Sequence, residues 1–504
     1  MHKARPNILV VMADQLSPAF LPIHGFDFVK APNITRLAER GVVFDSAYCN
    51  SPLCSPSRAV FMTGALPSRT GVYDNAAEFH ADIPTWAHHL RLAGYKTMLS
   101  GKMHFCGPDQ LHGIEQRLTT DIYPADFGWT PDWDRPDVRP SWYHNMSSVT
   151  DAGPCVRTNQ IDFDEETIHA AERALYDHVR SPDKRPFCLV ASLTHPHDPF
   201  AITRDYWDLY GHEAIPMPRR PQPPEPVDPH TKRLRHVSLM DETPVSDEQV
   251  RAARHAYFAA ISYVDANLGR LMRTLDATGL ADDTIVILTS DHGEMLGERG
   301  AWYKMSWLEP SARVPLVIAG PGHFAPKRVS SSVSLVDILP TLVELAGGEP
   351  SLPEIDGRSL VAHCEGLGGH DEAIGEYLAE GAVAPMVMIR RGPWKFIHSP
   401  SDPDQLFDLA SDPDETRNLA EDEAAAETLA AFRADVARRW DLAKLDQTVR
   451  ASQRRRRLVD RALSTGTVTA WDFQPVVDAS KQYMRNTIDL DDLEAMARFP
   501  RVRP

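Results

Sequence analysis

Side chains that could do chemistry stand at the ends of four short apolar runs. The runs at 7–14, 95–104, 187–197 and 284–294 end in Asp14 with Gln15, Lys102 with His104, His195 with His197, and Asp291 with His292. Apolar runs of this length, separated by helical patterns, indicate buried parallel strands. Ligands of an open parallel sheet bind at the carboxyl ends of its strands. A polar residue at one strand end would be interpreted as a cap or a turn. Polar residues at four strand ends together predict a functional site.

The residue types predict a metal centre beside cationic groups. The oxygens of Asp14, Gln15 and Asp291 are hard ligands suited to Ca²⁺ or Mg²⁺, and His292 is a candidate ligand or supporting donor. Lys102, His104, His197 and Lys304 would surround that ion with positive or proton-donating groups. Such a set suits a tetrahedral oxyanion ester, since it neutralises the ester oxygens and protonates the departing alkoxide. His195 and His255 are interpreted as structural.

The stretch "SPLCSPSRAVFMTG" (51–64) contains a single cysteine with no partner nearby. Pro56 suits a first helical turn, so Cys54 would stand at a helix N-terminus with Arg58 one turn later on the same face. That position favours anions and could activate a thiolate. A thiolate that attacks an ester leaves an intermediate that must still be resolved, and an incidental buried thiol is the structural alternative.

Bulk properties narrow the class of protein. A chain of 504 residues predicts two or three domains. The net charge of −17 argues against a nucleic-acid partner. The six cysteines are scattered without a paired spacing, the apolar run near the start is shorter than that of a signal peptide, and no run approaches a membrane span. We expect a cytoplasmic protein that does not associate with membranes.

The order of patterns predicts an α/β fold. We expect a large mixed, mostly parallel sheet sandwiched by helices (1–346), a smaller C-terminal α+β domain with an antiparallel sheet plus a helix (347–444), and a C-terminal extension (445–504). Helices are predicted at 33–41, 83–94, 251–279 and 421–440. The proline-rich segment 216–229 is predicted to be an extended loop. The arginine run in "QRRRRL" (453–458) predicts a solvated face or pairing with acidic neighbours, with polyanion binding as the alternative.

The stretch "CSPSRAVFMTG" resembles the signature of type I sulfatases in the alkaline phosphatase superfamily, Cys-x-Pro-Ser-Arg-x-x-x-x-Thr-Gly. "GKMHF", "PHDP", "SDHGE", Lys304 and "LFDLASDPDETRNLA" add family-like matches, so the resemblance spans most of residues 5–420. In that family a formylglycine-generating enzyme oxidises the cysteine to Cα-formylglycine, an aldehyde that hydrates to a gem-diol. The resemblance implies this modification at Cys54.

The resemblance also implies roles for the strand-end residues. Asp14, Gln15, Asp291 and His292 would bind a divalent ion with residue 54, Ca²⁺ being expected and Mg²⁺ or Mn²⁺ the alternatives. Gln15 is an amide where many members have a second Asp, which would lower metal affinity. One diol oxygen would attack sulfur while Arg58 and Lys102 hold the diol and sulfate oxygens. His197 or Lys304 would protonate the leaving alcohol, and His104 would help deprotonate the other hydroxyl, which expels sulfate.

Further stretches resemble the choline sulfatase subgroup, including "THPHDPF" and "WDFQPVVDASKQYMRN" in the extension. This likeness implies choline-O-sulfate as substrate and a homo-oligomer, a tetramer, with the extension at subunit contacts. A quaternary ammonium is best held by aromatic faces and negative charge. Residues 121–147 are dense in aromatics, and we predict contacts from Trp129, Tyr143, His144, Asn145 and Glu380; a packed aromatic loop is the structural alternative.

Two other functions are compatible with these motifs. A phosphonate monoester or phosphodiester hydrolase, or another alkyl or aryl sulfatase, would share Cys54, Arg58 and the metal ligands. A non-catalytic protein that binds anions or choline would keep Cys54 unmodified.

Overall fold

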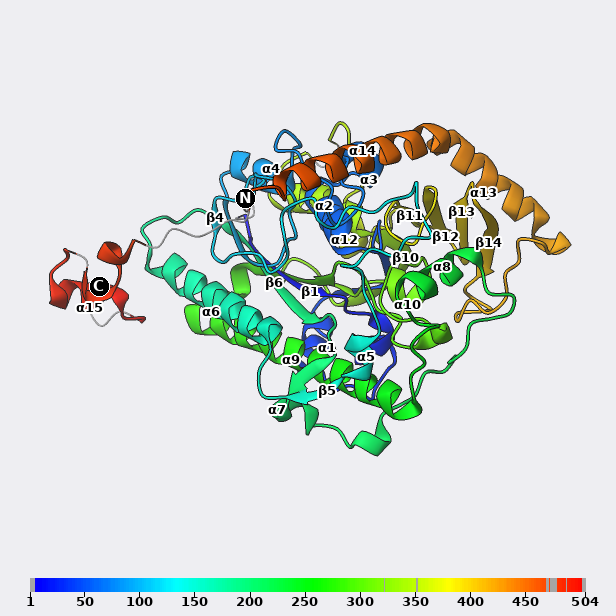
Figure 1. The fold of residues 1–504 in the computed structure, drawn as a ribbon. Coiled ribbons are helices and arrows are strands. Elements are labelled where there is room, and N and C mark those ends of the chain that lie inside the picture. Colours follow the sequence, from blue (N-terminus) through cyan, green and yellow to red (C-terminus); the bar gives the residue numbers. More distant parts are fainter. Residues whose placement is uncertain are drawn as a thin grey trace.

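The computed structural model describes residues 5–320, 322–349, 352–467, 471, 478–485 and 487–500. Its centre is an eight-stranded sheet in the order β10-β2-β9-β8-β1-β6-β3-β4 (Figure 1). The strands are β1 (Asn7–Asp14), β2 (Val42–Tyr48), β3 (Lys96–Gly101), β4 (Gln116–Arg117), β6 (Phe187–Pro196), β8 (Thr284–Ser290), β9 (Leu316–Ala319) and β10 (Lys327–Ser334). Neighbours are parallel except for β9, which is antiparallel to β2 and β8. The predicted mixed, mostly parallel sheet is confirmed.

The four predicted runs form four adjacent strands, β8-β1-β6-β3. Their registers align the carboxyl ends: Ala13 pairs with Ser290, and Gly101 pairs with Ser192. Every residue of β1, β6 and β8 is buried, which explains their unbroken apolar runs. The polar residues that follow these strands therefore meet at one edge of the sheet.

Helices cover both faces of the sheet, as Figure 1 shows. Alternate residues of β1 point to opposite sides: Leu9 packs in one core cluster and Ile8 in the other. The helices of the first cluster are α1 (Pro32–Ala38), α6 (Asn159–Arg180) and α9 (Asp247–Thr278), and those of the second are α2 (Cys54–Thr63), α4 (Trp86–Leu92) and α11 (Ile338–Leu345). Helix α9 begins at a capping box formed by Ser246 and Gln249 and ends at Gly279, whose φ is 69°.

Shorter elements complete this part of the chain. They are the two-stranded sheet of β5 (Gly153–Cys155) and β7 (Ala201–Thr203), and the helices α3 (Pro67–Thr70), α5 (Ser147–Thr150), α7 (Arg204–Trp207), α8 (Pro229–Val237), α10 (Glu309–Ala312) and α12 (Val361–Glu365). Among the described helices, none combines the length and the apolar character needed to span a bilayer.

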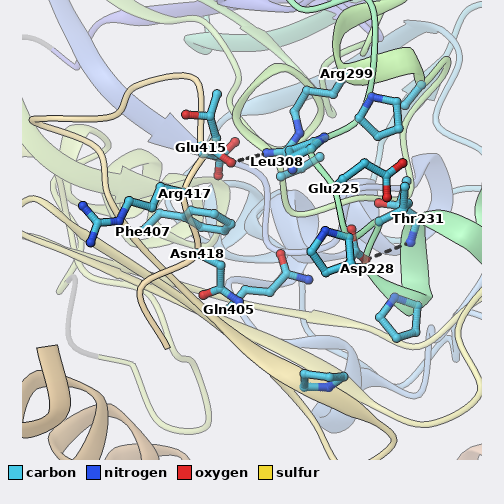
Figure 2. Close-up of a pocket in the computed structure, with 18 of the residues that line it drawn as sticks. Glu225, Asp228, Thr231, Arg299, Leu308, Gln405, Phe407, Glu415, Arg417 and Asn418 are labelled. Carbon is cyan, nitrogen blue, oxygen red and sulfur yellow. Dashed lines mark hydrogen bonds between the residues drawn. The ribbon is translucent and has the colours of Figure 1, made fainter. Parts of the chain in front are cut away.

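A separate antiparallel sheet confirms the predicted α+β part. Its strands are β11 (Glu372–Tyr377), β12 (Met386–Arg391), β13 (Trp394–Ser399) and β14 (Asp402–Asp408), paired in that order. Phe396 and Leu406 of this sheet share a small core with Phe432 of α13 (Ala426–Arg439). The proline-rich loop passes near this sheet, and together they line a cavity of about 570 Å³ (Figure 2). None of the predicted site residues lines it.

Helix α14 (Leu442–Leu463) spans the predicted start of the extension at residue 445 and lies across the main body, where Leu445 and Val449 join the first core cluster (Figure 1). Its arginines pair with acidic side chains: Arg454 with Asp134, Arg456 with Asp74, and Arg457 with Asp132. This is the predicted acidic pairing rather than a free polyanion surface. A short helix, α15 (Leu490–Ala497), lies near the end of the chain. Within the stretch "WDFQPVVDASKQYMRN" (471–486), residues 472–477 and 486 lie outside the described residues.

Candidate active site

Cys54 is the first residue of α2, as predicted, and every residue of this helix is buried. Leu53 has an extended backbone at the N-cap, and Gly64 ends the helix in the left-handed region with φ 63°. Burial and the neighbouring Asp14 carboxylate raise the pKa of the Cys54 thiol to about 11. The helix N-terminus therefore does not produce a thiolate at neutral pH, and the unmodified cysteine is a poor nucleophile.

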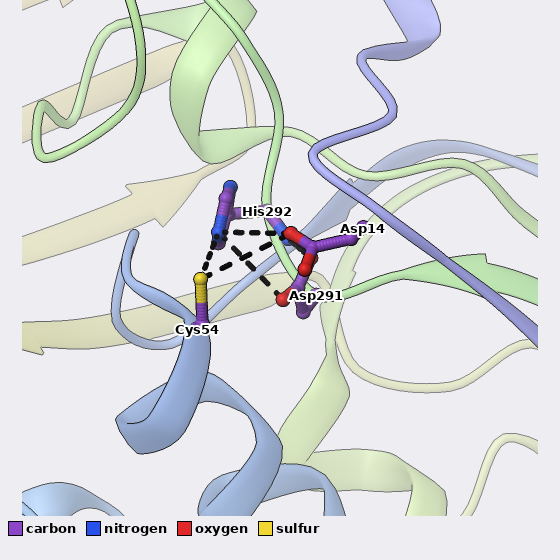
Figure 3. Close-up of side chains that lie close together, drawn as sticks. All are labelled: Asp14, Cys54, Asp291 and His292. Atoms are coloured by element: carbon purple, nitrogen blue, oxygen red, sulfur yellow. Dashed lines mark hydrogen bonds and ion pairs between the residues drawn. The ribbon is translucent and has the colours of Figure 1, made fainter. Parts of the chain in front are cut away.

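Four side chains from three elements form a compact cluster (Figure 3). Ligand atoms of Asp14, Cys54, Asp291 and His292 all lie within 4.8 Å of one another. His292 Nε2 lies 3.3 Å from Cys54 Sγ, 3.7 Å from Asp14 Oδ1 and 3.6 Å from Asp291 Oδ2. All four side chains are buried.

The protonation of this cluster fits a divalent cation. Burial lowers the pKa of His292 to about 4, so the ring is neutral. His292 Nδ1 is 3.0 Å from the Gly293 carbonyl and donates to it, which leaves the lone pair of Nε2 facing the carboxylates. Burial opposes ionisation of Asp14, but the charges of Lys102 and Arg58 hold its pKa well below the usual range. The oxygens of Asp14 and Asp291 and the neutral imidazole of His292 are a set that Ca²⁺ or Mn²⁺ accepts.

Gln15 follows β1 with a left-handed backbone, φ 65°. Its main-chain N–H donates to Asp291 Oδ1 at 3.1 Å. Its side-chain Oε1 accepts from Lys304 Nζ at 2.7 Å, and its Nε2 donates to Glu294 and, at 3.4 Å, to Asp198. The Gln15 amide thus links the carboxylate cluster to Lys304, and its role as a metal ligand stays a prediction.

Two buried cations, Arg58 and Lys102, compensate the carboxylates. Arg58 Nε donates to Asp291 Oδ2 at 2.9 Å, and Arg58 Nη2 lies 3.4 Å from Asp14 Oδ2. Lys102 Nζ donates to Asp14 and lies 4.1 Å from the centre of the Tyr123 ring. Arg58 Nη1 also donates to the Lys102 carbonyl at 2.7 Å, so the two cations are held together at the strand ends.

Lys304 and His197 lie in contact, with Nζ 2.6 Å from Nε2. Burial and the Lys304 charge hold the pKa of His197 well below its usual value. His197 Nδ1 donates to the Asp198 carbonyl at 2.6 Å, so Nε2 is the acceptor. Burial opposes the charge of Lys304, but nearby anionic groups raise its pKa overall. The proton between the two residues therefore resides on Lys304.

His104 presents a buried neutral imidazole. Its backbone is left-handed, φ 53°, and its N–H donates to Asp121 Oδ2 at 2.8 Å. Neither ring nitrogen has a hydrogen-bond partner within the part of the chain that the structure describes. Burial and the Lys102 charge lower the pKa of His104 to about 3. By contrast, His195 Nδ1 is engaged by Asp164 at 2.6 Å, as its structural interpretation requires.

A cavity of about 100 Å³ opens onto Cys54, His197 and Lys304. It is lined by Cys54, Asn75, Tyr123, Trp129, Trp142, His144, His197, Lys304 and Glu380. Three of the five predicted choline contacts, Trp129, His144 and Glu380, are among them. The cavity therefore brings Cys54, His197 and Lys304 together with aromatic rings and the Glu380 carboxyl.

The other two predicted contacts, Tyr143 and Asn145, do not line this cavity. Tyr143 is buried and its hydroxyl donates to Met305 Sδ at 2.8 Å. Asn145 is exposed, and its Oδ1 accepts from the Ser147 N–H at 2.8 Å near the start of α5. Both side chains already have local structural partners.

Sequence reasoning missed two kinds of residue here. Asn75 lines the cavity although it belongs to a loop with no periodic pattern, and its Oδ1 accepts from the Ser55 N–H at 2.9 Å. Asp198 and Glu294 hold Gln15 and lie within the quoted stretches "PHDP" and "SDHGE", where adjacency to predicted residues was a usable signal.

Glu380 is buried in the cavity wall, and burial raises the pKa of its carboxyl to about 8. Its Oε2 has no hydrogen-bond partner among the described residues. A buried carboxyl without a partner is costly and favours a cationic ligand beside it.

Comparisons with known proteins agree with the geometry. The chain matches the family model "Sulfatase" over residues 6–348, "N-sulphoglucosamine sulphohydrolase, C-terminal" over 297–440, and "Choline sulfatase enzyme C terminal" over 447–499. It is 50% identical to the choline-sulfatase of Rhizobium meliloti (strain 1021), over 99% of this chain and 100% of that one. It is 31% identical to arylsulfatase K of Danio rerio, over 81% and 78% of the two chains.

Among solved structures, the phosphonate monoester hydrolase of Agrobacterium radiobacter superposes with a TM-score of 0.69 at 26% identity, covering 89% of this chain and 96% of that one. The likeness supports a shared fold. The family match covers the segment that carries the clustered side chains and is reinforced by the full-length relative. The chain is therefore a member of the sulfatase family of sulfuric ester hydrolases.

Proposed function

We propose that this enzyme hydrolyses choline-O-sulfate to choline and sulfate. One observation carries the proposal: a single cavity is lined both by Cys54 and by Trp129, Trp142 and Glu380. The substrate is zwitterionic, so its two ends need surroundings of opposite character. The relative that matches the whole chain bears the name choline-sulfatase, which supports the same assignment.

The aromatic wall suits a quaternary ammonium. The Trp129 and Trp142 rings are stacked with centroids 6.1 Å apart, and Tyr123 lies 5.4 Å from Trp129. A cation that cannot donate hydrogen bonds is attracted to such ring faces by about 0.5–2 kcal/mol for each contact. Glu380 adds a carboxyl whose ionised form is stabilised by the bound cation.

The nucleophile and the cation that complete the site are inferred from the family. We infer that a formylglycine-generating enzyme converts Cys54 to formylglycine, whose hydrated form supplies a nucleophilic hydroxyl together with a second one for sulfate release. We infer Ca²⁺, with Mg²⁺ or Mn²⁺ as alternatives, held by Asp14, Asp291, His292, residue 54 and Gln15. That ion would supply positive charge against the sulfate oxygens.

The chain's own residues account for the remaining chemistry. Arg58 and Lys102 orient residue 54 and hold the sulfate oxygens, because their charges converge on the cluster. Lys304 donates a proton to the departing choline oxygen, and His197 holds Lys304 in place through Nε2. His104, neutral and without a hydrogen-bond partner on its ring, accepts a proton from residue 54 when sulfate leaves.

Three measurements test this function. Mass spectrometry of the peptide that contains residue 54 should find formylglycine, and Cys54→Ala should abolish turnover while the fold is kept. Hydrolysis of choline-O-sulfate should be faster than hydrolysis of a phenylphosphonate monoester. Faster phosphonate turnover would favour the phosphonate monoester hydrolase, and an unmodified Cys54 in a protein that still binds choline would favour a binding protein.

Assembly and location are further parts of the proposal. We infer a homotetramer in the cytoplasm, the first from the extension that matches a choline sulfatase C-terminal segment and the second from six free thiols. Sedimentation at working concentration should give a tetramer, and a monomer would contradict the assembly.

A further inference from the structure

One arginine of α14 reaches the neighbourhood of the active-site cavity. Arg456 Nη1 and Nη2 donate to the two carboxylate oxygens of Asp74 at 2.8 and 2.7 Å, and Nη1 also donates to Thr130 Oγ1 at 3.0 Å. The Arg456 side chain is 7% exposed and that of Asp74 is fully buried. A bidentate pair of this kind fixes both orientation and distance.

Both partners of Arg456 are next to residues of the cavity wall. Asp74 precedes Asn75, and Thr130 follows Trp129. Asn75 in turn receives the Ser55 N–H, so this loop also borders the start of α2. The guanidinium of Arg456 therefore ties together two wall segments that belong to different loops.

Helix α14 also contacts a third segment of the cavity wall, the one that carries Glu380. Gln453 Oε1 accepts from the Trp133 N–H at 3.0 Å, and Arg450 donates to the carbonyls of Trp133 and Val383 at 2.7 and 2.6 Å. Trp133 Nε1 donates to the Ala379 carbonyl at 2.9 Å, directly before Glu380. Helix α14 is thus hydrogen-bonded to the segments that carry Asn75, Trp129 and Glu380.

A neighbouring arginine provides the contrast. Arg454 pairs with Asp134, but its side chain is 63% exposed. Such surface pairs contribute about 0–1 kcal/mol, whereas removal of one partner from a buried pair leaves an uncompensated charge and is strongly destabilising. The two arginines lie on one helix and differ in burial and in what they hold.

We propose that Arg456 is a positioning residue that sets the geometry of the cation-binding wall and so the preference for a cationic alcohol. This inference rests on the proposed function, since it assigns the wall to the ammonium end of the substrate. Arg456 does not line the cavity. It acts through Asp74 and Thr130, whose displacement would move Asn75 and Trp129 while leaving Arg58, Lys102 and Lys304 in place.

Arg456→Lys tests the proposal, because it keeps the charge and loses the bidentate geometry. The kcat/KM for choline-O-sulfate should fall about tenfold, mainly through KM, while kcat/KM for methyl sulfate, which has no group to reach the wall, stays within twofold. Arg454→Lys is the matched control and should change neither value. A folded Arg456→Lys variant that loses both esters equally, or neither, would overturn the proposal.

A second variant covers loss of folding. If circular dichroism shows that Arg456→Lys is unfolded, the double variant Asp74→Asn with Arg456→Gln replaces the ion pair by neutral amides. The same selective loss is expected from it, and unaltered selectivity in the folded double variant would overturn the proposal.

Inhibition by tetramethylammonium separates this inference from the proposed function. If the unaltered enzyme shows no preference for choline-O-sulfate over methyl sulfate, the proposed function fails. The positioning role is then judged by tetramethylammonium as an inhibitor of methyl sulfate hydrolysis. Its inhibition constant should rise about tenfold in Arg456→Lys, and an unchanged constant would refute the role of Arg456.

Discussion

Lys304 and His197 were both predicted as proton donors to the leaving alcohol, but only one of the two side chains is charged. The Asp198 carbonyl fixes the proton of His197 on Nδ1, so Nε2 can only accept from Lys304. Two cations in contact would repel, and burial removes the charge from the group with the lower ordinary pKa. This arrangement favours Lys304 over His197 as the proton donor, which stays a prediction.

The loss of kcat caused by replacing Lys304 should therefore depend on the leaving group of the ester. For Lys304→Met we expect kcat for choline-O-sulfate to fall by about 10²–10⁴, since an alkoxide needs a proton as it leaves. Nitrophenolate leaves without one, so 4-nitrophenyl sulfate should lose less than about tenfold. His197→Gln, which keeps an acceptor near Lys304, serves as the comparison and should lose less. Equal losses on both esters in Lys304→Met would contradict the assignment.

Glu380 predicts a pH dependence of substrate binding. Burial raises the pKa of its carboxyl from the ordinary 4.5 to about 8, with Asp74 raising it further and Lys304 opposing. Below about pH 8 the group is protonated, and above it the carboxylate attracts the ammonium. The KM for choline-O-sulfate should therefore fall as pH rises through about 8.

3,3-Dimethylbutyl sulfate has an uncharged tert-butyl group in place of the trimethylammonium group, so its KM should not fall as pH rises. Glu380→Gln should remove the fall in KM for choline-O-sulfate. Substrate binding by Glu380 improves as pH rises, but its contribution to the free energy of unfolding falls. Because the folded chain keeps a proton that the unfolded chain releases above pH 4.5, this group's contribution to stability declines between pH 4.5 and 8. A KM profile for Glu380→Gln identical to that of the unaltered enzyme would exclude Glu380 as the source.

At the scale of elements, strand ends were the most predictable feature. Asp14 ends a strand, and Lys102 and Asp291 follow strands, that their apolar runs identify, and α2 begins at Cys54 as its proline and glycine indicate. Parallel strands with aligned carboxyl ends leave little freedom in where these residues lie. The clustering of these polar residues was therefore predictable from the sequence.

The cavity wall was less predictable because loops carry it. Asn75 and Trp142 belong to segments without a period of 2 or 3.6, so no pattern indicates where their side chains point. Tyr143 is adjacent to Trp142 but bonds to Met305 instead. The amphipathic pattern of α14 likewise predicts a buried face without saying which surface covers it.

The end of β3 depends on Gly101. Its φ is 98°, and a Cβ there would lie 2.0 Å from the Ser192 carbonyl oxygen of β6 and 2.7 Å from Thr167 Cγ2. Gly101→Ala should lower the free energy of unfolding by at least about 3 kcal/mol, from left-handed strain and overpacking together. Lys102 would be displaced with it, so activity should fall as well.

Gly71→Ala is the control for backbone strain alone. Its φ is 80°, and no heavy atom lies within 4 Å of the added Cβ. Urea unfolding should show a loss of about 1–2 kcal/mol. Equal losses in the two variants would show that the contact between β3 and β6 is not the constraint.

At the scale of the whole molecule, the site joins elements that are distant in the chain. Asp14 is the last residue of β1, Cys54 begins α2, and Asp291 follows β8, the strand next to β1. Arg58 bridges the two carboxylates, so two adjacent strands and one helix meet through charge. A cation bound there would tie these elements together in the folded chain only.

Metal removal should therefore lower both activity and thermal stability. An ion that binds only the native state stabilises it by about 2.7 kcal/mol at a concentration one hundred times its Kd. We expect chelation to lower the Tm by several degrees and turnover by at least about 100-fold, and added Ca²⁺ to restore both. In Asp291→Asn, which removes a charge from the predicted ligand set, the Tm should no longer respond to Ca²⁺. The contrary outcome is that chelation changes the Tm of neither the unaltered enzyme nor Asp291→Asn. In that case Arg58 and Lys102 alone stabilise the buried carboxylates, and a bound metal does not contribute to the stability of the fold.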